Sequence, residues 1–147
     1  MRRTATTAFL LGMFTMATIS TPSQIKTTTL EALHNQRVLL VFGNGDNQLA
    51  EAQLDVAAKH VTDFHERDLV LAGLAGSDPA VPALLLSAPS DAKSRVRFHV
   101  KAGEFTVILI GRDGGEKLRS HQPILWETLQ HTIDAMPMRQ GEMRRKP

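Results

Sequence analysis

The sequence predicts an α/β fold in which a four-stranded mixed sheet is flanked by helices. Two short runs rich in valine and leucine, at 37–42 and 68–72, are typical of strands that are covered on both faces. Residues 49–65 lie between them with apolar side chains at helical spacing, and a helical crossover makes the two strands parallel. A third apolar run, at 105–111, is followed by a turn and a returning strand, which completes the sheet.

The first twenty residues are expected to be a secretory signal peptide. A cationic start, MRR, precedes the short apolar stretch TATTAFLLGMFTMATI, and cleavage is expected after Ser20. An uncleaved membrane anchor is the alternative. The predicted location is periplasmic or secreted. The predicted organisation is a signal peptide at 1–20, a flexible lead-in at 21–29, one domain at 30–138 and a C-terminal tail at 139–147.

Charge and cysteine content exclude several classes of function. The chain has 17 lysines plus arginines, 15 acidic residues and no cysteine. Loss of residues 1–20 would remove Arg2 and Arg3 and no acid, which leaves 15 basic against 15 acidic residues. A neutral chain does not indicate a nucleic-acid surface, since phosphate binding needs a net cationic face, and no membrane contact is expected after cleavage. Without cysteine the chain has no disulfide, iron–sulfur cluster or thiol nucleophile.

The elements before residue 73 are assigned from local signals. Residues 30–36 are expected to form a short helix or an irregular approach to the first strand. The segment GNGDNQ ends that strand, and Asp46 or Asn47 is expected to cap the following helix. That helix, at 49–65, is amphipathic, because its acidic residues and its apolar residues occupy different angles.

The elements after residue 73 are less regular at first. Residues 73–90 carry no clear period and receive no assignment, and residues 91–100 fit either a short helix or a strand. The strand at 105–111 should be central, because it is apolar on both faces. Pro123 is expected to open a last helix that ends at Pro137 and buries one side. This order of strands and helices is that of a thioredoxin-like domain.

The segment GRDGGEK, between the third and fourth strands, allows two interpretations. A phosphate loop of the Walker type would need glycine, four residues, glycine, lysine and then serine or threonine, followed by a helix. The segment has neither that spacing nor a helix after it. Asp113 and Gly114 between two strands instead favour a tight hairpin, in which glycine supplies the positive φ.

Four segments of the chain resemble a known family. RVLLVF, ERDLVL, FTVILIGRDGGEKLRS and IDAMPMRQGEM resemble the signature segments of the bacterial family called domain of unknown function 4174. That domain is similar to the peroxiredoxin-like C-terminal domain of sushi-repeat and DRO1-type extracellular proteins. The usual GKDGG of the family reads GRDGG here, with Arg112 in the place of lysine. The resemblance implies an exported thioredoxin-like fold and supplies no catalytic residue.

Redox chemistry in a thioredoxin-like fold takes place where the first strand meets its helix, because the helix N-terminus stabilises a thiolate there. This chain has no sulfur at that point, so dithiol exchange and thiol-dependent peroxide reduction are excluded. Asn44 and Asp46 remain as an alternative non-thiol site, with His121 expected close to Asp46 as an acid–base partner. The competing interpretation is an ordinary capped turn.

The opposite end of the predicted sheet should gather charged residues. If the third strand is antiparallel to the first two, then the Arg112 turn, the segment HERD and the segment MPMRQGE meet where the first strands begin. One interpretation is a structural lock, in which arginines bind carboxylates and loop carbonyls; the other is a surface that binds a polar ligand or partner. The candidate ligand-binding residues are Arg67, Asp68, Arg112, Asp113, Lys117 and Arg139, with Glu66 and Glu142 in the same cluster.

The sequence predicts no metal site, no cofactor and no catalytic residue. Met136, Met138 and Met143 cluster near the C-terminus, and thioethers can select Cu(I), but core packing explains methionine more simply. The leading functional hypothesis is a non-catalytic module that binds an unknown protein or a small polar ligand. The alternative is a non-thiol enzyme or redox accessory protein that acts at the end of the first strand.

Overall fold

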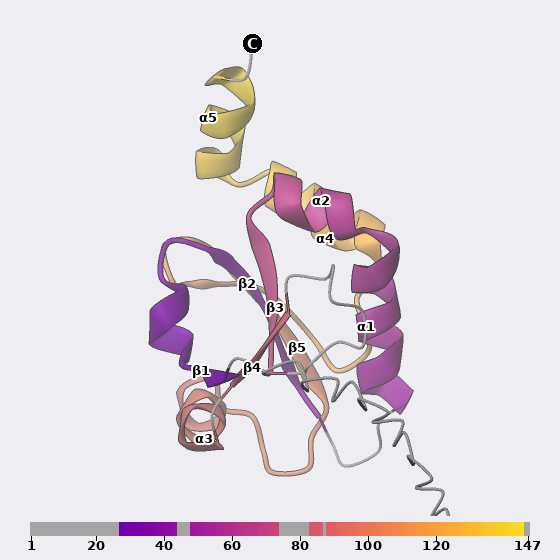
Figure 1. Cartoon of the computed structure of the whole chain (residues 1–147), viewed down its shortest axis with the longest axis vertical. Helices are drawn as coiled ribbons and strands as arrows, with labels where there is room; N and C mark the ends of the chain where they lie inside the picture. The colour runs from indigo at the N-terminus through magenta and orange to yellow at the C-terminus, as the bar shows by residue number, and fades with distance from the viewer. Residues whose placement is uncertain (1–26, 44–47, 74–82, 87, 146–147) are drawn as a thin grey trace, which may run out of the picture.

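The computed structural model describes residues 27–43, 48–73, 83–86 and 88–145. Within these residues six strands form one sheet in the order β1-β4-β3-β2-β5-β6 (Figure 1). The strands are β1 (Thr27–Thr28), β2 (Arg37–Phe42), β3 (Leu69–Ala72), β4 (Ala83–Leu86), β5 (Thr106–Ile110) and β6 (Glu116–Ser120). The helices are η1 (Leu30–Leu33, a 3-10 helix), α1 (Gln48–Lys59), α2 (Val61–Glu66), α3 (Ala88–Arg97), α4 (Trp126–Asp134) and α5 (Pro137–Arg145).

The predicted α/β fold with a four-stranded mixed sheet is confirmed. The four predicted strands are adjacent in the order β3-β2-β5-β6, with β2 and β3 parallel and β5 antiparallel to both β2 and β6. This order is consistent with a thioredoxin-like arrangement. The sheet also continues past β3 through two short strands, β4 and β1, which pair in parallel. Strand β4 lies in the segment that the sequence left unassigned.

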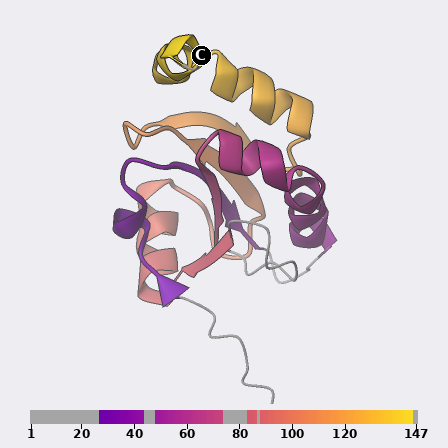
Figure 2. The same ribbon diagram turned by 45° about the horizontal axis from the view of Figure 1, so that its top comes forward.

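Helices cover both faces of the sheet. Helices α1, α2 and α4 lie on one face, and α3 and η1 lie on the other (Figures 1 and 2). Alternate residues of each central strand point to opposite faces, so Leu39 and Leu109 pack with Trp126 and Leu129 of α4, whereas Leu40 and its neighbours face the second layer. Both central strands are buried along their whole length, as their apolar runs predict.

Two predicted helix boundaries differ from the structure. The helix expected at 49–65 is broken into α1 and α2 at His60, whose backbone has φ −125° and ψ 32°. The break brings the His60 ring against Trp126, with ring centroids 4.8 Å apart. The last core helix begins at Trp126 instead of Pro123, with Leu125 as its N-cap residue. Both differences depend on tertiary contacts that a periodic pattern does not contain.

Three further segments, which the sequence left open or assigned to a tail, are helical in the structure. Residues 30–33 are the short helix that was one of two options, and residues 91–97 belong to helix α3. Residues 139–145, which the sequence assigned to a C-terminal tail, form most of helix α5, and Arg139 within it is buried. The predicted signal peptide and the expected cap at Asp46 or Asn47 lie outside the described residues. Among the helices that the structure describes, none is long and apolar enough to cross a membrane.

Candidate functional site

The hairpin predicted at GRDGG is present and is closed by two backbone hydrogen bonds. The amide of Gly111 donates to the carbonyl of Gly115, and the amide of Gly114 donates to the carbonyl of Gly111, both at 2.9 Å. Gly114 has φ +75°, a value that favours glycine in the turn at 112–114, and the pairing of β5 with β6 shifts register between Leu109 and Ile110. The turn holds Arg112 and Asp113 at the tip of the hairpin. The phosphate-loop interpretation is excluded by this geometry.

The strand starts and the hairpin meet at one end of the sheet, as the sequence predicts. The amide of Arg37, the first residue of β2, donates to the carbonyl of Asp68, which directly precedes β3. Val38 pairs with Ile110 at the end of β5, next to the hairpin. Helix α5 lies beyond this end (Figure 1). We call the ionic side chains gathered here the arginine cluster: Arg37, Arg67, Arg112 and Arg139, with Asp63, Glu66, Asp68, Asp134 and Glu142.

Two arginines of the cluster bind the same carboxylate. Arg67 donates to Asp134 through Nε at 3.1 Å and through a terminal nitrogen at 3.0 Å, which is a bidentate pair. Arg139 donates to Asp134 at 3.2 Å and also to the carbonyl of Glu66 at 3.1 Å and its carboxylate at 3.2 Å. Arg67 is 5% and Arg139 2% exposed. These contacts join α2, α4 and α5, as the structural-lock interpretation expects.

Glu142 of α5 binds the other two arginines. Its Oε1 lies 2.9 Å from a terminal nitrogen of Arg37 and 3.2 Å from a terminal nitrogen of Arg112. Arg112 also pairs with Asp68, whose backbone has φ +46°. A second terminal nitrogen of Arg37 donates to the carbonyl of Arg67 at 2.7 Å. Helix α5 is therefore fastened to the sheet largely by charge-assisted hydrogen bonds.

Arg37 is a site residue that the sequence reasoning missed. Its side chain is 1% exposed, although it is the first residue of a strand and was read only as the start of an apolar run. The signal was the place of Arg37 at the start of RVLLVF, because a cation that is buried at the end of a doubly covered strand needs acceptor partners. Its main partner, Glu142, is 105 positions further along the chain, and no local pattern links the two.

The remaining two predicted residues form a separate pair beside the cluster. Lys117 of β6 donates to Asp113 at 2.6 Å, and the Asp113 carboxylate also accepts from the amide of Gly115. The hydrogen bond from Lys117, followed by that from Gly115, holds the pKa of Asp113 below its usual value. Both side chains are partly exposed, so this pair is open to solvent.

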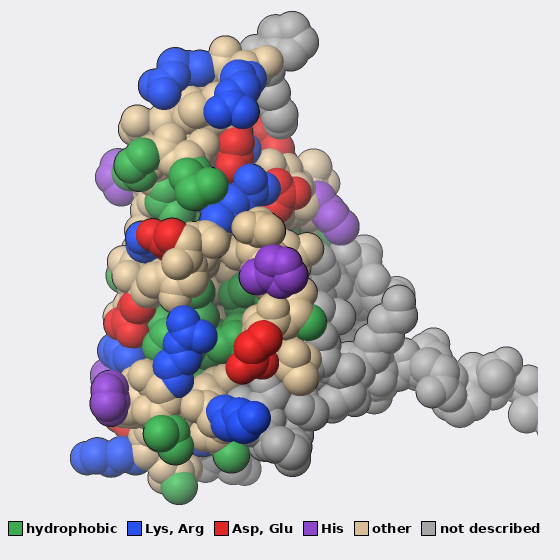
Figure 3. Space-filling view, turned by 90° about the vertical axis from the view of Figure 1, so that its left-hand side faces the viewer, with side chains coloured by type: hydrophobic (Ala, Val, Ile, Leu, Met, Phe, Trp, Pro, Cys, Tyr) green, Lys and Arg blue, Asp and Glu red, His purple; other side chains and the backbone are tan. Residues whose placement is uncertain are grey.

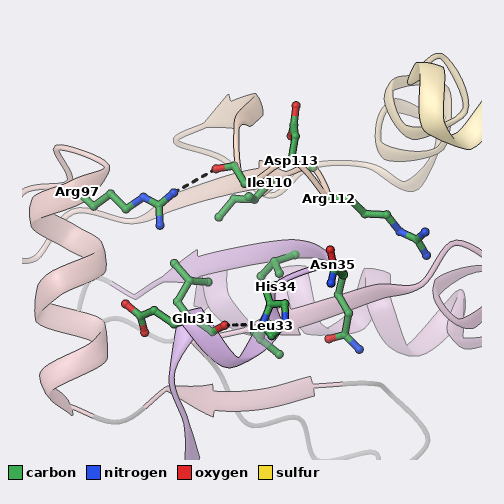
Figure 4. Close-up of a pocket in the computed structure, with 13 residues that line it drawn as sticks. Glu31, Leu33, His34, Asn35, Arg97, Ile110, Arg112 and Asp113 are labelled. Atoms are coloured by element: carbon green, nitrogen blue, oxygen red, sulfur yellow. Dashed lines mark hydrogen bonds between the residues drawn. The ribbon is translucent and has the colours of Figure 1, made fainter.

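A first cavity lies between the hairpin and the segment 30–36. Its volume is about 210 Å³. Leu33, Val38 and Ile110 line its floor, and the polar lining includes Glu31, His34, Asn35, Arg97 and Asp113. Arg97 of α3 reaches across to donate to the carbonyl of Gly114 at 3.2 Å, whereas the side chain of Arg112 extends away from Glu31 and His34 (Figure 4). Sequence reasoning did not single out His34, Asn35 or Arg97 for this place.

Figure 3 shows the mixed polar and apolar character of one face of the molecule. It is hollowed near its centre, where hydrophobic side chains lie below side chains of Lys or Arg, Asp or Glu, and His. Acidic and basic side chains alternate on this face instead of gathering into a patch of one sign. A mixed border of this kind suits a polar ligand better than a polyanion.

A second cavity lies on the other side of the hairpin. Its volume is about 110 Å³. It is bounded by the hairpin, by Lys117 and by the junction of α4 and α5, and its lining residues are Arg37, Gly111, Arg112, Asp113, Lys117, Met136, Pro137 and Met138. Arg112 and Asp113 line both cavities, so the tip of the hairpin is the wall between them.

The alternative site at the end of the first strand is described only in part. Asn44 and Asp46 lie outside the described residues. His121 lies near the end of β2, because its ring nitrogen is 3.3 Å from the hydroxyl of Thr106, which pairs with Phe42. Nδ1 of His121 is also 3.4 Å from the carboxylate of Glu104. In the described part of the chain, no group of three or more His, Cys, Asp or Glu side chains could hold a metal ion.

The carboxylates of the arginine cluster make the stability of the fold depend on pH. Burial alone would raise the pKa of Asp134, but hydrogen bonds from Arg67 and Arg139 outweigh it and hold that pKa below its usual value. Burial opposes ionisation of Glu142 in the same way, and Arg37 and Arg112 lower its pKa. A lowered pKa in the folded chain stabilises the fold fully above the pKa of the unfolded chain, and this stabilisation is lost as pH falls through the folded pKa.

We therefore expect the Tm to fall steeply below about pH 4, near the unfolded pKa values of aspartate and glutamate. Thermal unfolding followed by circular dichroism from pH 7 to pH 3 measures this. Glu142→Gln should make the loss in acid shallower, because one of the titrating groups is gone. Glu127→Gln, at an exposed position of α4, is the matched control and should leave the slope unchanged. Equal slopes in all three proteins would contradict the assignment.

The comparison with protein families gives one match. The family described as "Domain of unknown function (DUF4174)" matches residues 29–142. This range includes the hairpin, the whole arginine cluster and the described residues that line both cavities. No curated protein matches the sequence.

Proposed function

We propose that this chain, which belongs to the DUF4174 family, is a non-catalytic binding module whose site is the hairpin tip at residues 111–115. The leader-like sequence of residues 1–20 supports export, so the proposed place of action is the periplasm or the exterior of the cell. The proposed ligand is a small polar molecule or the polar group of a partner protein. The alternative is a non-thiol enzyme that acts around Asn44, Asp46 and His121.

One observation carries the proposal: the hairpin tip, which is held by hydrogen bonds and ion pairs, borders both cavities. A binding site needs groups that are held in place before the ligand arrives, since ordering them on binding would weaken affinity. Arg112 is fixed by Asp68 and Glu142, and Asp113 is fixed by Lys117 and the amide of Gly115. Polar groups around an apolar floor are the usual composition of a ligand site.

The arginine cluster supports this site without being the site. Arg67 and Arg139 are buried and hold α2, α4 and α5 together through Asp134. Their contacts therefore hold in place the α4–α5 junction that bounds the second cavity. In this interpretation Arg67 and Arg139 are positioning residues, whereas Arg112, Asp113 and Lys117 face the ligand.

Nuclear magnetic resonance of the purified, ¹⁵N-labelled chain tests the proposal. The probes are butyrate, butyramide, butylammonium, glucose, glycylglycine and inorganic phosphate, each titrated at constant ionic strength. At least one probe should shift the amides of Gly111, Gly114 and Gly115 to saturation and raise the Tm, because a ligand that binds the native state stabilises it. If none of the probes shifts the amide resonances of these three glycines, the proposal is overturned.

Two histidine variants locate the ligand. A ligand in the first cavity should lose affinity in His34→Ala, because His34 lines that cavity. His131→Ala, at an exposed position of α4, is the matched control and should bind as the unmutated chain does. Saturable shifts that gather around His121 and spare the hairpin would favour the alternative site.

A further inference from the structure

We propose that the first cavity binds a small zwitterion that carries an apolar group, which is the chemistry of a free apolar amino acid. The inference rests on the proposed function, since it names the ligand of one of the two cavities that the hairpin tip borders. Three observations carry it: an accessible cation and an accessible carboxylate that are not paired with each other, acceptors gathered on one wall, and an apolar floor.

Arg97, the last residue of α3, is the cation that the cavity has to offer. Its Cζ lies 5.1 Å from the centroid of the Phe98 ring, and one terminal nitrogen donates to the carbonyl of Gly114 at 3.2 Å. These contacts orient the guanidinium and use no carboxylate, and Arg97 forms no ion pair with any residue that the structure describes. Because Arg97 is exposed, a ligand can reach its remaining N–H groups.

Glu31 of η1 is the corresponding carboxylate. It is exposed, and its side chain makes no hydrogen bond or ion pair within the described part of the chain. In Figure 4, Glu31 lies below Arg97 on the side of the cavity nearer to α3, and the two side chains do not form an ion pair. A ligand that has both charges can therefore bind each group without breaking an existing ion pair.

The other charged side chains of the lining are already neutralised. Arg112 is bound to two carboxylates, and Asp113 is bound to a lysine. Glu31 and Arg97 thus leave the cavity with one accessible charge of each sign. A simple anion would be repelled by Glu31, and a simple cation by Arg97, whereas a zwitterion is attracted by both.

His34 adds an acceptor to the wall that carries Glu31. Its Nδ1 lies 3.0 Å from the carbonyl oxygen of Glu31. A carbonyl oxygen can only accept, so the proton of the neutral imidazole is on Nδ1, and Nε2 is left as an acceptor. The segment 30–36 therefore offers acceptors to an ammonium group, while Arg97 offers donors to a carboxylate.

The floor of the cavity favours an apolar group on the ligand. Leu33, Val38 and Ile110 form this floor and are 5%, 2% and 4% exposed. Covering them with an apolar side chain removes further apolar surface from water. The volume of about 210 Å³ is below the range of drug-binding sites, about 300–1,000 Å³, so the ligand has few non-hydrogen atoms.

Leucine is the direct probe. In the ¹⁵N-labelled chain it should shift the amides of His34 and Gly114 and the Nε–H of Arg97 to saturation. N-acetylleucine lacks the ammonium group and leucinamide lacks the carboxylate, so each should bind about tenfold more weakly or worse. Glycine has both charges and no side chain, and it should also bind about tenfold more weakly, because the apolar contact is lost.

Glycylleucine distinguishes two sources of the same chemistry, since a peptide bond separates its ammonium group from its carboxylate. Binding of leucine alone assigns the cavity to free amino acids. Binding of glycylleucine as well assigns it to short peptides. Both results support a zwitterion that carries an apolar group.

Two charge variants separate recognition from folding. Arg97→Gln should abolish the preference for leucine over leucinamide and keep the preference over N-acetylleucine, and Glu31→Gln should do the reverse. Lys93→Gln and Glu51→Gln, at exposed positions of α3 and α1, are the matched controls and should change the affinity for leucine less than twofold. All four positions are exposed, so the Tm should stay within about 3 °C. A purely structural role would weaken the binding of all three ligands together.

The failures of the two proposals are distinguishable. If leucine leaves these resonances unchanged while another probe shifts the amides of Gly111, Gly114 and Gly115, the zwitterion site is wrong and the binding module stands. If neither leucine nor any other probe shifts the hairpin, both are wrong. Equal binding of leucine and N-acetylleucine, or of leucine and leucinamide, would also overturn the zwitterion assignment, because one of the two charges would then play no part in recognition.

Discussion

Arg139→Ala is expected to lower the free energy of unfolding by about 3 kcal/mol, as the loss of one partner from a buried ionic network does. The Arg139 side chain donates to the carboxylates of Asp134, Glu66 and Glu142 and to the carbonyl of Glu66. Alanine removes all of these donors and leaves a void at a position that is 2% exposed. Helix α5 would lose its ionic attachment to Glu66 and Asp134 and keep that of Glu142 to the arginines of the sheet end.

The measurement is chemical unfolding in urea at pH 7, supported by thermal melts. For a domain of this size, 3 kcal/mol corresponds to a decrease in Tm of roughly 10 °C. Arg144→Ala is the matched control, because it removes an arginine from the same helix at an exposed position, and it should stay within about 0.5 kcal/mol of the unmutated chain. Equal stabilities of the two variants would disprove the structural role of Arg139.

Gly73→Ala is the second change with a large expected effect. Gly73 follows β3 with φ +103°, and a Cβ placed there would lie 2.2 Å from the carbonyl oxygen of Val41. Val41 is in the central strand β2, whose backbone cannot move without disturbing its pairing on both sides. We expect a loss of about 3 kcal/mol or more, because the unfavourable φ and the steric clash act together.

Two other glycines separate these contributions. Gly103 has φ +73° and nothing within 4 Å of its added Cβ, so Gly103→Ala should cost only the conformational part, about 1–2 kcal/mol. Gly43 has neither a positive φ nor a near neighbour, and Gly43→Ala should be close to neutral. In urea unfolding, the loss of free energy of unfolding should be largest for the Gly73 variant, intermediate for the Gly103 variant and smallest for the Gly43 variant. A Gly73 variant no less stable than the Gly103 variant would refute the clash.

The fold could be predicted because its signals are local. Apolar runs such as RVLLVF and FTVILI identify the central strands, and Asp113-Gly114 identifies the hairpin, since each of these segments contains the reason for its own conformation. Strands β1 and β4 were missed because they are short, and residues 73–90 have no period. The break at His60 was missed because it depends on the contact with Trp126 across the core.

The candidate site could be predicted in part. The convergence of Asp68, Arg112 and Arg139 followed from strand direction alone, without any knowledge of side-chain geometry. Arg37 and Asp134 could not be added in the same way, because their partners are set by the docking of α5 and α4. The first cavity was missed for a related reason: Arg97 of α3 and His34 come from separate layers, and only their packing against the hairpin brings them together.

Strand β6 is an edge strand of the sheet, and its composition affects the tendency of the protein to aggregate at high concentration. An outermost strand offers unpaired amides and carbonyls to any other extended chain, which is how sheets join edge to edge into aggregates. Here that strand contains the charged residues Glu116, Lys117 and Arg119 and a single apolar residue, and the charged side chains form hydrogen bonds with their neighbours. A second strand that paired with β6 would have to desolvate several charged side chains, and this cost disfavours aggregation through the β6 edge.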